Sequence, residues 1–281
     1  RQMCIRDSLY QLFVREYGTN NFPDCSNMCH EPSGSGMRPQ VGVGKGTVTL
    51  EDFEHADAIL IFGQNPGTNH PRMLGELRHA AKRGARIMSF NPMRERGLER
   101  FADPQAKIEM ATNSSTPISS HYFQLRVGGD FALVKGMMKY LVECEDAGEQ
   151  VIDHTFIAEH TTGFGDVVED LRAESWALLE QESGLSIEQI RTAAEVYKNA
   201  ERTIACWGMG ITQHPHSVAT IQMIGNLLLM RGNIGREGAG LCPVRGHSNV
   251  QGDRTMGIWE KPPAALLDRL GQVLSLIHIS E

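Results

Sequence analysis

Residues 58–90 read AILIFGQNPGTNHPRMLGELRHAAKRGARIMSF, and this pattern predicts a strand, a helix and a second strand. The apolar run at 58–62 is short and ends at a glycine, which is typical of a strand buried on both faces. Residues 73–83 carry apolar side chains at helical spacing, and Gly84 is the residue type that commonly ends a helix. The second strand is expected over 85–90. A strand, helix and strand in this order predict a parallel βαβ unit with a right-handed crossover.

The chain after this unit continues to alternate helices with buried strands. Asp130 is expected to cap a helix over 131–143, and 203–207 is expected to form another buried strand before a helix over 218–231. Three further helices are predicted between them, at residues 153–160, 166–174 and 186–199. The predicted fold class is therefore α/β: a doubly wound, mostly parallel sheet with flanking helices.

Composition and charge exclude several classes of protein. Of the 281 residues, 41% are hydrophobic and 22% are charged, which is ordinary for a globular domain with a real core. The net charge of −7 provides no basic stripe, so no nucleic-acid partner is expected. Apolar runs stay short of the roughly 20 residues that span a membrane, so no membrane segment is expected and the cytoplasm is the default location. The cysteines follow no regular framework, which argues against a secreted disulfide scaffold.

Polar, glycine-bearing loops follow three of the predicted strands. In doubly wound sheets, ligands bind beyond the carboxyl ends of the strands, where loops and helix N-termini supply backbone donors. We therefore expect Asn65, Asn91 and Gly208 to lie at the ends of neighbouring strands and to line one groove suited to a phosphate-bearing nucleotide. No loop has the G-x-G-x-x-G pattern, which weakens a nicotinamide interpretation. The three loops span residues 63–70, 91–96 and 208–213.

Two distant segments carry the groups of a metal centre: residues 25–33 read CSNMCHEPS, and residues 243–252 read PVRGHSNVQG. A thiolate, an adjacent imidazole and a guanidinium can hold a transition metal, move a proton and bind a small anion. The spacing by itself leaves alternatives open. A structural zinc corner at Cys25, Cys29 and His30 is one alternative, although the spacing is not C-x2-C and no second Cys/His pair lies at finger distance. Cys29 also suits an inert buried thiol, and Arg245 also suits a structural loop arginine.

These segments and loops resemble the molybdopterin oxidoreductases over about residues 9–272, in particular the formate dehydrogenase alpha subunit-like branch and its acid-resistance-associated subgroup. The resemblance implies molybdenum, or tungsten, held by two molybdopterin guanine dinucleotides. It implies Cys29 as the metal ligand, His30 as the catalytic proton acceptor and Arg245 as the catalytic anion clamp. It also implies a 4Fe-4S cluster in a missing N-terminal part. The implied cofactor-binding residues are Asn65, Thr68, Asn69, Asn91, Arg94, Gly208, Met209, Gln213, His247 and Asn249.

The resemblance also suggests how the chain is organised, as a fragment of a larger multi-domain molybdopterin enzyme. The terminal octapeptides RQMCIRDS and LSLIHISE match neither the family nor the neighbouring pattern, so both are expected to be non-native tails. Between them we expect a segment leading to the metal ligand, a Rossmann-like molybdopterin-binding domain and the start of a following region. The expected boundaries are 1–8, 9–29, 30–252, 253–273 and 274–281.

The activity implied is the two-electron oxidation of formate, or of a similar small anionic substrate, with electrons passing to an unknown acceptor; the fragment alone is expected to be inactive. Two residues depart from the formate dehydrogenase pattern: Glu31 replaces a glycine and His247 replaces a glutamine. A carboxylate beside the site raises the cost of binding an anion and leaves the substrate open. The alternatives are a non-catalytic molybdopterin-binding relative acting in acid stress through partners, and a nicotinamide-dependent Rossmann dehydrogenase.

Overall fold

A computed structural model describes residues 2–22, 24–247 and 250–274. The chain divides into two compact units. The smaller unit is built from the two ends of the chain, up to Glu31 and from His247 onward, and the larger unit is Pro32–Gly246. Residue 1 and residues 275–281 of the predicted tails lie outside the described residues.

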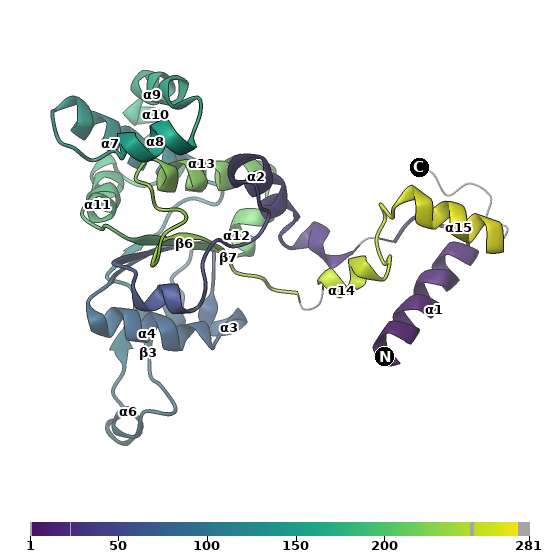
Figure 1. Ribbon diagram of the computed structural model, residues 1–281. Coiled ribbons are helices and arrows are strands. Elements are labelled where there is room, and N and C mark those ends of the chain that lie inside the picture. Colours follow the sequence, from purple (N-terminus) through teal and green to yellow (C-terminus); the bar gives the residue numbers. More distant parts are fainter. Residues whose placement is uncertain (1, 23, 248–249, 275–281) are drawn as a thin grey trace. The chain divides into compact units, whose positions relative to one another are not determined.

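A five-stranded sheet forms the centre of the larger unit (Figure 1). The strand order is β5-β2-β1-β6-β7, and every neighbouring pair is parallel. β1 is central, and its Ile59 pairs with Ile87 on one side and Ile204 on the other. This topology confirms the predicted doubly wound, mostly parallel α/β fold. The strands are β1 (Ala58–Phe62), β2 (Arg86–Phe90), β5 (His121–Phe123), β6 (Thr203–Trp207) and β7 (Gly240–Pro243).

Helices cover both faces of the sheet because the strands are apolar on both faces. Leu60 and Phe62 face one hydrophobic cluster, and Ile59 and Ile61 face the other. Figure 1 shows α11 and α13 on the side opposite α4. The first cluster takes its helical residues mainly from α7 (Asp130–Asp146), α11 (Ile187–Lys198) and α13 (Ser217–Leu229), and the second from α4 (Met73–Arg83) and the 3-10 helix η2 (Glu51–Glu54).

One helix of the middle region was not predicted. α10 (Trp176–Ser183) packs on α7, where the Trp176 indole donates a 2.6 Å hydrogen bond to Glu143. The sequence did not predict this helix because its apolar periodicity is weak. The contact with α7 stabilises it in the folded chain. The remaining helices of this unit are α3 (Pro66–Asn69), α5 (Arg96–Glu99), α6 (Lys107–Thr112), α8 (His154–His160), α9 (Phe164–Ala173) and α12 (Met209–Thr212); α2 (Glu31–Val41) begins at the unit boundary.

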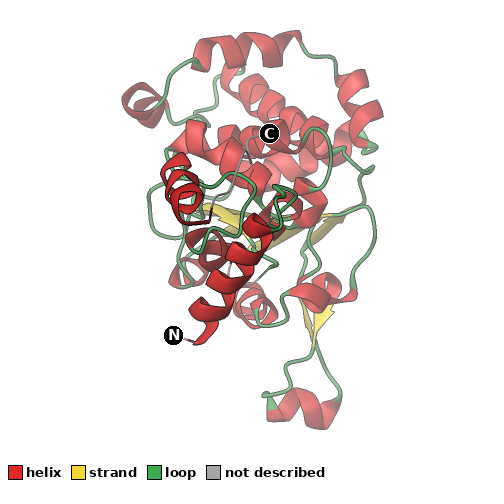
Figure 2. Cartoon of the chain, turned by 90° about the vertical axis from the view of Figure 1, so that its right-hand side faces the viewer, coloured by secondary structure: helices red, strands yellow, loops and turns green. Residues whose placement is uncertain are grey.

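A small projection leaves the larger unit between β2 and β5 (Figure 2). It consists of an antiparallel pair, β3 (Arg100–Phe101) with β4 (Thr116–Pro117), and of α6 at its tip. Glu109 anchors it, because its carboxylate accepts hydrogen bonds from Arg78 at 2.7 Å and from Lys82 at 2.8 Å. The hydrogen bond from Arg78, more than any other contact, holds the pKa of Glu109 below its usual range.

The predicted cap of α7 is wrong by one residue. Gly129 is the cap, and Asp130 is the first helical residue. The backbone of Gly129 turns back to Arg126 through a 2.9 Å hydrogen bond, and a Cβ at Gly129 would lie 2.7 Å from the Ser183 carbonyl oxygen. The helix therefore starts before Asp130 can cap it. Asp130 is only 4% exposed, and burial raises its pKa to about 7.

The smaller unit joins the two ends of the chain. Its elements are α1 (Gln2–Glu16), the 3-10 helix η1 (Cys25–Met28), α14 (Val250–Thr255) and α15 (Ala264–Leu274). The buried Arg15 donates to Asn20 at 2.9 Å and to the Trp259 carbonyl at 2.7 Å, and its guanidinium lies over the Phe22 ring. Among the described residues of the whole chain, no helix has the length and apolar character to cross a membrane.

Replacing Asp130 with asparagine is expected to change how stability depends on pH. The pKa of this carboxyl is 3.8 in the unfolded chain and about 7 in the folded one, so the folded state retains a proton that the unfolded state has released. This term lowers the free energy of unfolding by up to about 1.4 kcal/mol per pH unit as pH rises towards 7, and it stays constant above that. In urea unfolding between pH 5 and 7, the free energy of unfolding of wild type should fall relative to that of Asp130→Asn by up to that amount per pH unit. The difference should stay constant from pH 7 to 8. Parallel curves would contradict it.

Candidate functional site

The three polar loops meet at one edge of the sheet. β2, β1 and β6 are parallel neighbours, so Asn65, Asn91 and Gly208 all lie just beyond carboxyl ends on the same side. The strand pairing continues past the strands: the Gly63 amide donates to Phe90 at 3.0 Å, and the Gly208 amide donates to Phe62 at 3.2 Å. The expected placement is correct. The groove and the binding roles stay predictions.

Glycines press these loops together backbone to backbone. Gly63 has φ +51°, and a Cβ there would lie 2.9 Å from Gly210, whose amide donates to the Gly63 carbonyl at 3.0 Å. On the other side, a Cβ at Gly97 would lie 2.7 Å from the Cα of Gly67. Any side chain would separate the loops, so glycine is required on both sides of the central loop.

Asn65 ties the loop after β1 to the loop after β2. Its Oδ1 accepts from the Thr68 amide at 3.1 Å and caps α3, while its Nδ2 donates to Glu95 at 2.6 Å. Thr68 and Asn69 lie on α3, with Thr68 exposed. Glu95 was not among the predicted site residues, because nothing in the sequence shows that it crosses to a neighbouring loop.

The loop after β2 presents both amide and cationic groups. Asn91 is buried, and its backbone amide donates to the Phe123 carbonyl at 3.1 Å. Arg94 is exposed; its Nε donates to Glu99 at 2.6 Å and its guanidinium lies 5.1 Å from the centre of the Tyr122 ring. The cation is therefore held at this edge with its charge partly offset.

The loop after β6 begins α12. Gly208 is the cap of this helix, and a Cβ there would lie 3.1 Å from the Gly63 carbonyl oxygen. Met209 is the first helical residue, and its carbonyl accepts from the Gln213 amide at 3.0 Å. Close packing therefore also restricts the space for a side chain at Gly208.

Two further polar residues at this edge were missed. Gln64 is 3% exposed; its Nε2 faces His70 Nδ1 at 3.3 Å, but its buried Oε1 has no hydrogen-bond partner among the described residues. Within the same described part of the chain, the buried His214 Nε2 also has none, and burial lowers the pKa of His214. An unpaired buried polar group costs about 1–3 kcal/mol. Both residues lie in or beside the three loops, but only the tertiary structure shows their burial.

His70 connects the central loop to Arg245. Its Nε2 lies 2.9 Å from the Arg245 carbonyl oxygen, while its Nδ1 faces Gln64. Arg245 is exposed, follows β7, and donates from its guanidinium to the Gly44 carbonyl at 2.9 Å. The structure therefore brings the predicted anion clamp to the same edge as the predicted cofactor loops.

The segment around Cys29 lies in the smaller unit. Cys29 is 3% exposed and His30 is 1% exposed, and both directly precede α2. The Cys29 amide donates to the Ser26 carbonyl at 3.0 Å, and Asp24 caps η1 by accepting from the Ser26 amide at 2.7 Å. Both predicted chemical groups are thus buried beside a short, capped turn.

Arg254 of α14 holds both ends of this segment. It donates to Asp24 at 2.5 Å and to Glu31 at 2.7 Å, and it also contacts the Ser26 hydroxyl. Burial raises the pKa of Asp24, but hydrogen bonds from Arg254 and Ser26 outweigh it and bring that pKa below its usual value. The Glu31 carboxylate, expected from the sequence to oppose anion binding, therefore has its charge offset by an arginine.

The remaining predicted residues are only partly placed. His247 is exposed in the smaller unit, and Asn249 lies outside the described residues. Cys29 and His30 belong to one unit and Arg245 to the other, so their predicted approach stays a prediction. Among the described residues, no group of three His, Cys, Asp or Glu side chains could hold a metal ion.

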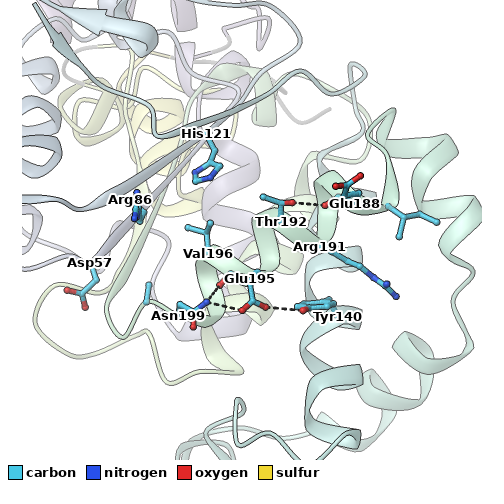
Figure 3. Close-up of a pocket in the computed structure, with 12 residues that line it drawn as sticks. Asp57, Arg86, His121, Tyr140, Glu188, Arg191, Thr192, Glu195, Val196 and Asn199 are labelled. Carbon is cyan, nitrogen blue, oxygen red and sulfur yellow. Dashed lines mark hydrogen bonds between the residues drawn. The ribbon is translucent and has the colours of Figure 1, made fainter.

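A cavity of about 900 Å³ opens at the opposite edge of the sheet (Figure 3). Asp57, Arg86 and His121 line it at the amino ends of β1, β2 and β5, together with residues of α7 and α11. Two of its polar groups bind each other, since the Tyr140 hydroxyl donates to Glu195 at 2.9 Å. None of the predicted site residues lines this cavity, so its size does not make it the candidate site.

Comparison with known proteins shows the family to which this chain belongs. Residues 7–257 match the family model described as molybdopterin oxidoreductase. Protein YdeP of Escherichia coli is 57% identical over 269 residues, covering 94% of this chain and 35% of the relative. Formate dehydrogenase H of the same organism is 33% identical over 251 residues, covering 88% of this chain and 32% of the relative. The chain thus spans about a third of the length of these relatives.

A solved structure with a similar fold is acetylene hydratase from Pelobacter acetylenicus. The TM-score is 0.64 at 20% sequence identity, over 84% of this chain and 29% of that one. At this identity the similarity concerns the fold alone.

Replacing Gly63 with alanine should weaken the junction of the loops. The added Cβ would meet the Gly210 backbone at a positive φ, so we expect a loss of more than about 2 kcal/mol in the free energy of unfolding. Gly75 is the matched control: it lies inside α4, and a Cβ there would meet nothing within 4 Å, so Gly75→Ala should stabilise by about 0.5–1 kcal/mol. If Gly63→Ala and Gly75→Ala changed the free energy of unfolding in urea by the same amount, the close approach of Gly63 to Gly210 would not contribute to stability.

Replacing Arg254 with alanine should loosen the segment around Cys29. The buried Asp24 would lose its charged partner, so the free energy of local opening should fall by about 1.5–3 kcal/mol. Native-state hydrogen exchange at the Ser26 and Cys29 amides measures this directly. Arg172→Ala is the control, since Arg172 pairs with the exposed Asp146 in similar geometry and should leave these amides unchanged. If the Ser26 and Cys29 amides exchange at the same rate in Arg254→Ala as in wild type, Arg254 does not stabilise this segment.

Proposed function

Because this chain belongs to the molybdopterin oxidoreductase family, we propose that it forms the cofactor- and substrate-binding part of a formate dehydrogenase-like enzyme. The proposed reaction is the two-electron oxidation of formate or a similar small anion. The observation that supports it best is that three polar loops and Arg245 meet at the carboxyl edge of one parallel sheet. Ligands of this fold class bind at that edge.

The residues present suit a molybdenum, or tungsten, centre with two molybdopterin guanine dinucleotides. Gln64 and His214 each offer a buried polar atom that has no hydrogen-bond partner among the described residues, and the absence of side chains at Gly63 and Gly210 would let a ligand approach the backbone. Cys29 would supply the protein ligand, since a thiolate suits a soft metal centre. When bound, the cofactor supplies a metal that accepts two electrons.

The protein side chains would bind the substrate and move its proton. The Arg245 guanidinium is exposed and presents a planar fork that suits a carboxylate, which it would bind by a charge-assisted bidentate pair. His30 is buried beside Cys29 and would take up the proton released in the oxidation. The pairing of Glu31 with Arg254 reduces the electrostatic cost that Glu31 would otherwise add.

The proposal extends to the whole protein, of which this chain represents about a third by comparison with its relatives. It includes a 4Fe-4S cluster upstream of Cys29, a cytoplasmic location and an electron acceptor whose class is open. The chain by itself should be inactive. A full-length protein that binds the cofactor but does not turn over formate or any small anion would instead support a non-catalytic relative.

Replacing Arg245 with alanine in the full-length enzyme should impair substrate use without releasing the metal. Loss of a charge-assisted pair costs about 1.5–3 kcal/mol, so kcat/KM for formate with a dye acceptor should fall by about 10- to 150-fold. Arg86→Ala is the control, because Arg86 lies at the amino edge of the sheet and should leave kcat/KM unchanged. Equal kcat/KM in wild type and Arg245→Ala would exclude the clamp role.

Replacing Cys29 with alanine should change the metal itself. Loss of the protein thiolate alters the ligand set, so the paramagnetic signal of the metal should shift or the metal content should fall. Cys25→Ala is the matched control, four residues away on η1, and should leave that signal in place. If metal content and signal were the same in Cys29→Ala and wild type, the metal-ligand assignment would be wrong.

A further inference from the structure

Two cysteines outside the proposed active site face each other across neighbouring strands. Cys206 of β6 pairs in register with Cys242 of β7, and both are free thiols. Paired strands lie about 4.7–4.9 Å apart, which is within the Cα separation of about 4.4–6.8 Å that a disulfide spans. Both side chains belong to the hydrophobic cluster that includes Ile61 and Leu77, so they point to the same face of the sheet.

The two thiols differ in access and in acidity. Cys206 is fully buried, whereas Cys242 lies on the edge strand of the sheet and is partly exposed. The Cys206 thiol donates a hydrogen bond to the Cys242 sulfur, which lowers the pKa of Cys242 although burial opposes this. Burial raises the pKa of Cys206. Attack on an oxidant requires an accessible thiolate, whereas the resolving sulfur can be buried if it lies in contact with the first and releases its proton as it attacks.

We propose that Cys242 and Cys206 form a peroxide-sensitive pair in which Cys242 reacts first and Cys206 resolves it to a disulfide. The Cys242 thiolate attacks hydrogen peroxide, the O–O bond breaks, and with one proton the products are Cys242 sulfenic acid and water. The Cys206 sulfur then attacks that sulfur as its proton passes to the departing hydroxide, the S–O bond breaks, and a second water leaves. Two thiols are oxidised and one peroxide is reduced to two waters.

The position of the disulfide gives the oxidation a structural consequence. Trp207 and then Gly208 follow Cys206, and the Val244 amide beyond Cys242 donates to the Trp207 carbonyl at 3.0 Å. The covalent bond would therefore fasten β6 to β7 just before the loop at Gly208 and the segment carrying Arg245. This inference does not depend on the proposed function, because neither thiol is among its cofactor or substrate ligands.

Peptide mapping tests the pair directly. The full-length protein is reduced, exposed to hydrogen peroxide, alkylated and digested with trypsin. Cys206 falls in the tryptic peptide 203–231 and Cys242 in 237–245, each of which contains a single cysteine. The expected result is a cross-linked pair of these peptides that dithiothreitol separates, with loss of two alkylatable thiols per chain. In Cys206→Ala, dimedone should instead label Cys242.

Controls distinguish this pair from general thiol oxidation. Cys144→Ser removes another buried thiol outside the pair and should leave the cross-link intact, whereas Cys242→Ala should abolish it. N-acetylcysteine oxidised in the same tube verifies the oxidant. If that thiol is consumed while Cys206 and Cys242 remain fully alkylatable in wild type, the proposal is overturned. A cross-link that includes Cys242 but a cysteine other than Cys206 would overturn it equally.

Discussion

The parallel pairing of β1 with β2 and β6 is the constraint on which the rest of the larger unit depends. Parallel strands all end at the same edge, so the segments after Phe62, Phe90 and Trp207 become neighbours although they are far apart in sequence. Such strands must be buried on both faces, and the two apolar clusters meet that requirement. The core therefore determines where the candidate site lies.

The loops at this edge use glycines, which lower stability but let the loop backbones approach one another closely. Gly63, Gly67, Gly97 and Gly210 bury no side chain and lose more conformational freedom on folding than other residues would, yet they allow backbone to meet backbone. Gln64 retains a buried oxygen that no described group pairs with, which is a cost that a bound ligand would remove. Two buried polar atoms without a partner among the described residues, Gln64 Oε1 and His214 Nε2, lie where a cofactor is proposed to bind.

The smaller unit positions the adjacent Cys29 and His30 side chains by other means, because its described residues form helices and turns rather than a sheet. Arg254 joins Asp24 to Glu31 on either side of Cys29 and His30, so one guanidinium orders the turn between them. The same contact also balances charge, because the carboxylate of Glu31, two residues after the proposed metal ligand, is paired with Arg254. In this respect the two units use different means, backbone packing in one and an ion-pair network in the other.

The sequence by itself determined the βαβ unit, the parallel sheet and the edge at which Asn65, Asn91 and Gly208 lie, because apolar period and glycine position are local properties of the chain. It did not reveal α10, the true start of α7 at Asp130, or the link from Gln64 through His70 to Arg245. It also suggested that Glu31 would oppose an anion, whereas Arg254 offsets it. Each of these depends on a partner far away in sequence. Burial and pairing are properties of the folded chain, so only the tertiary structure decided which polar groups are satisfied, which are left unpaired and which charges are balanced.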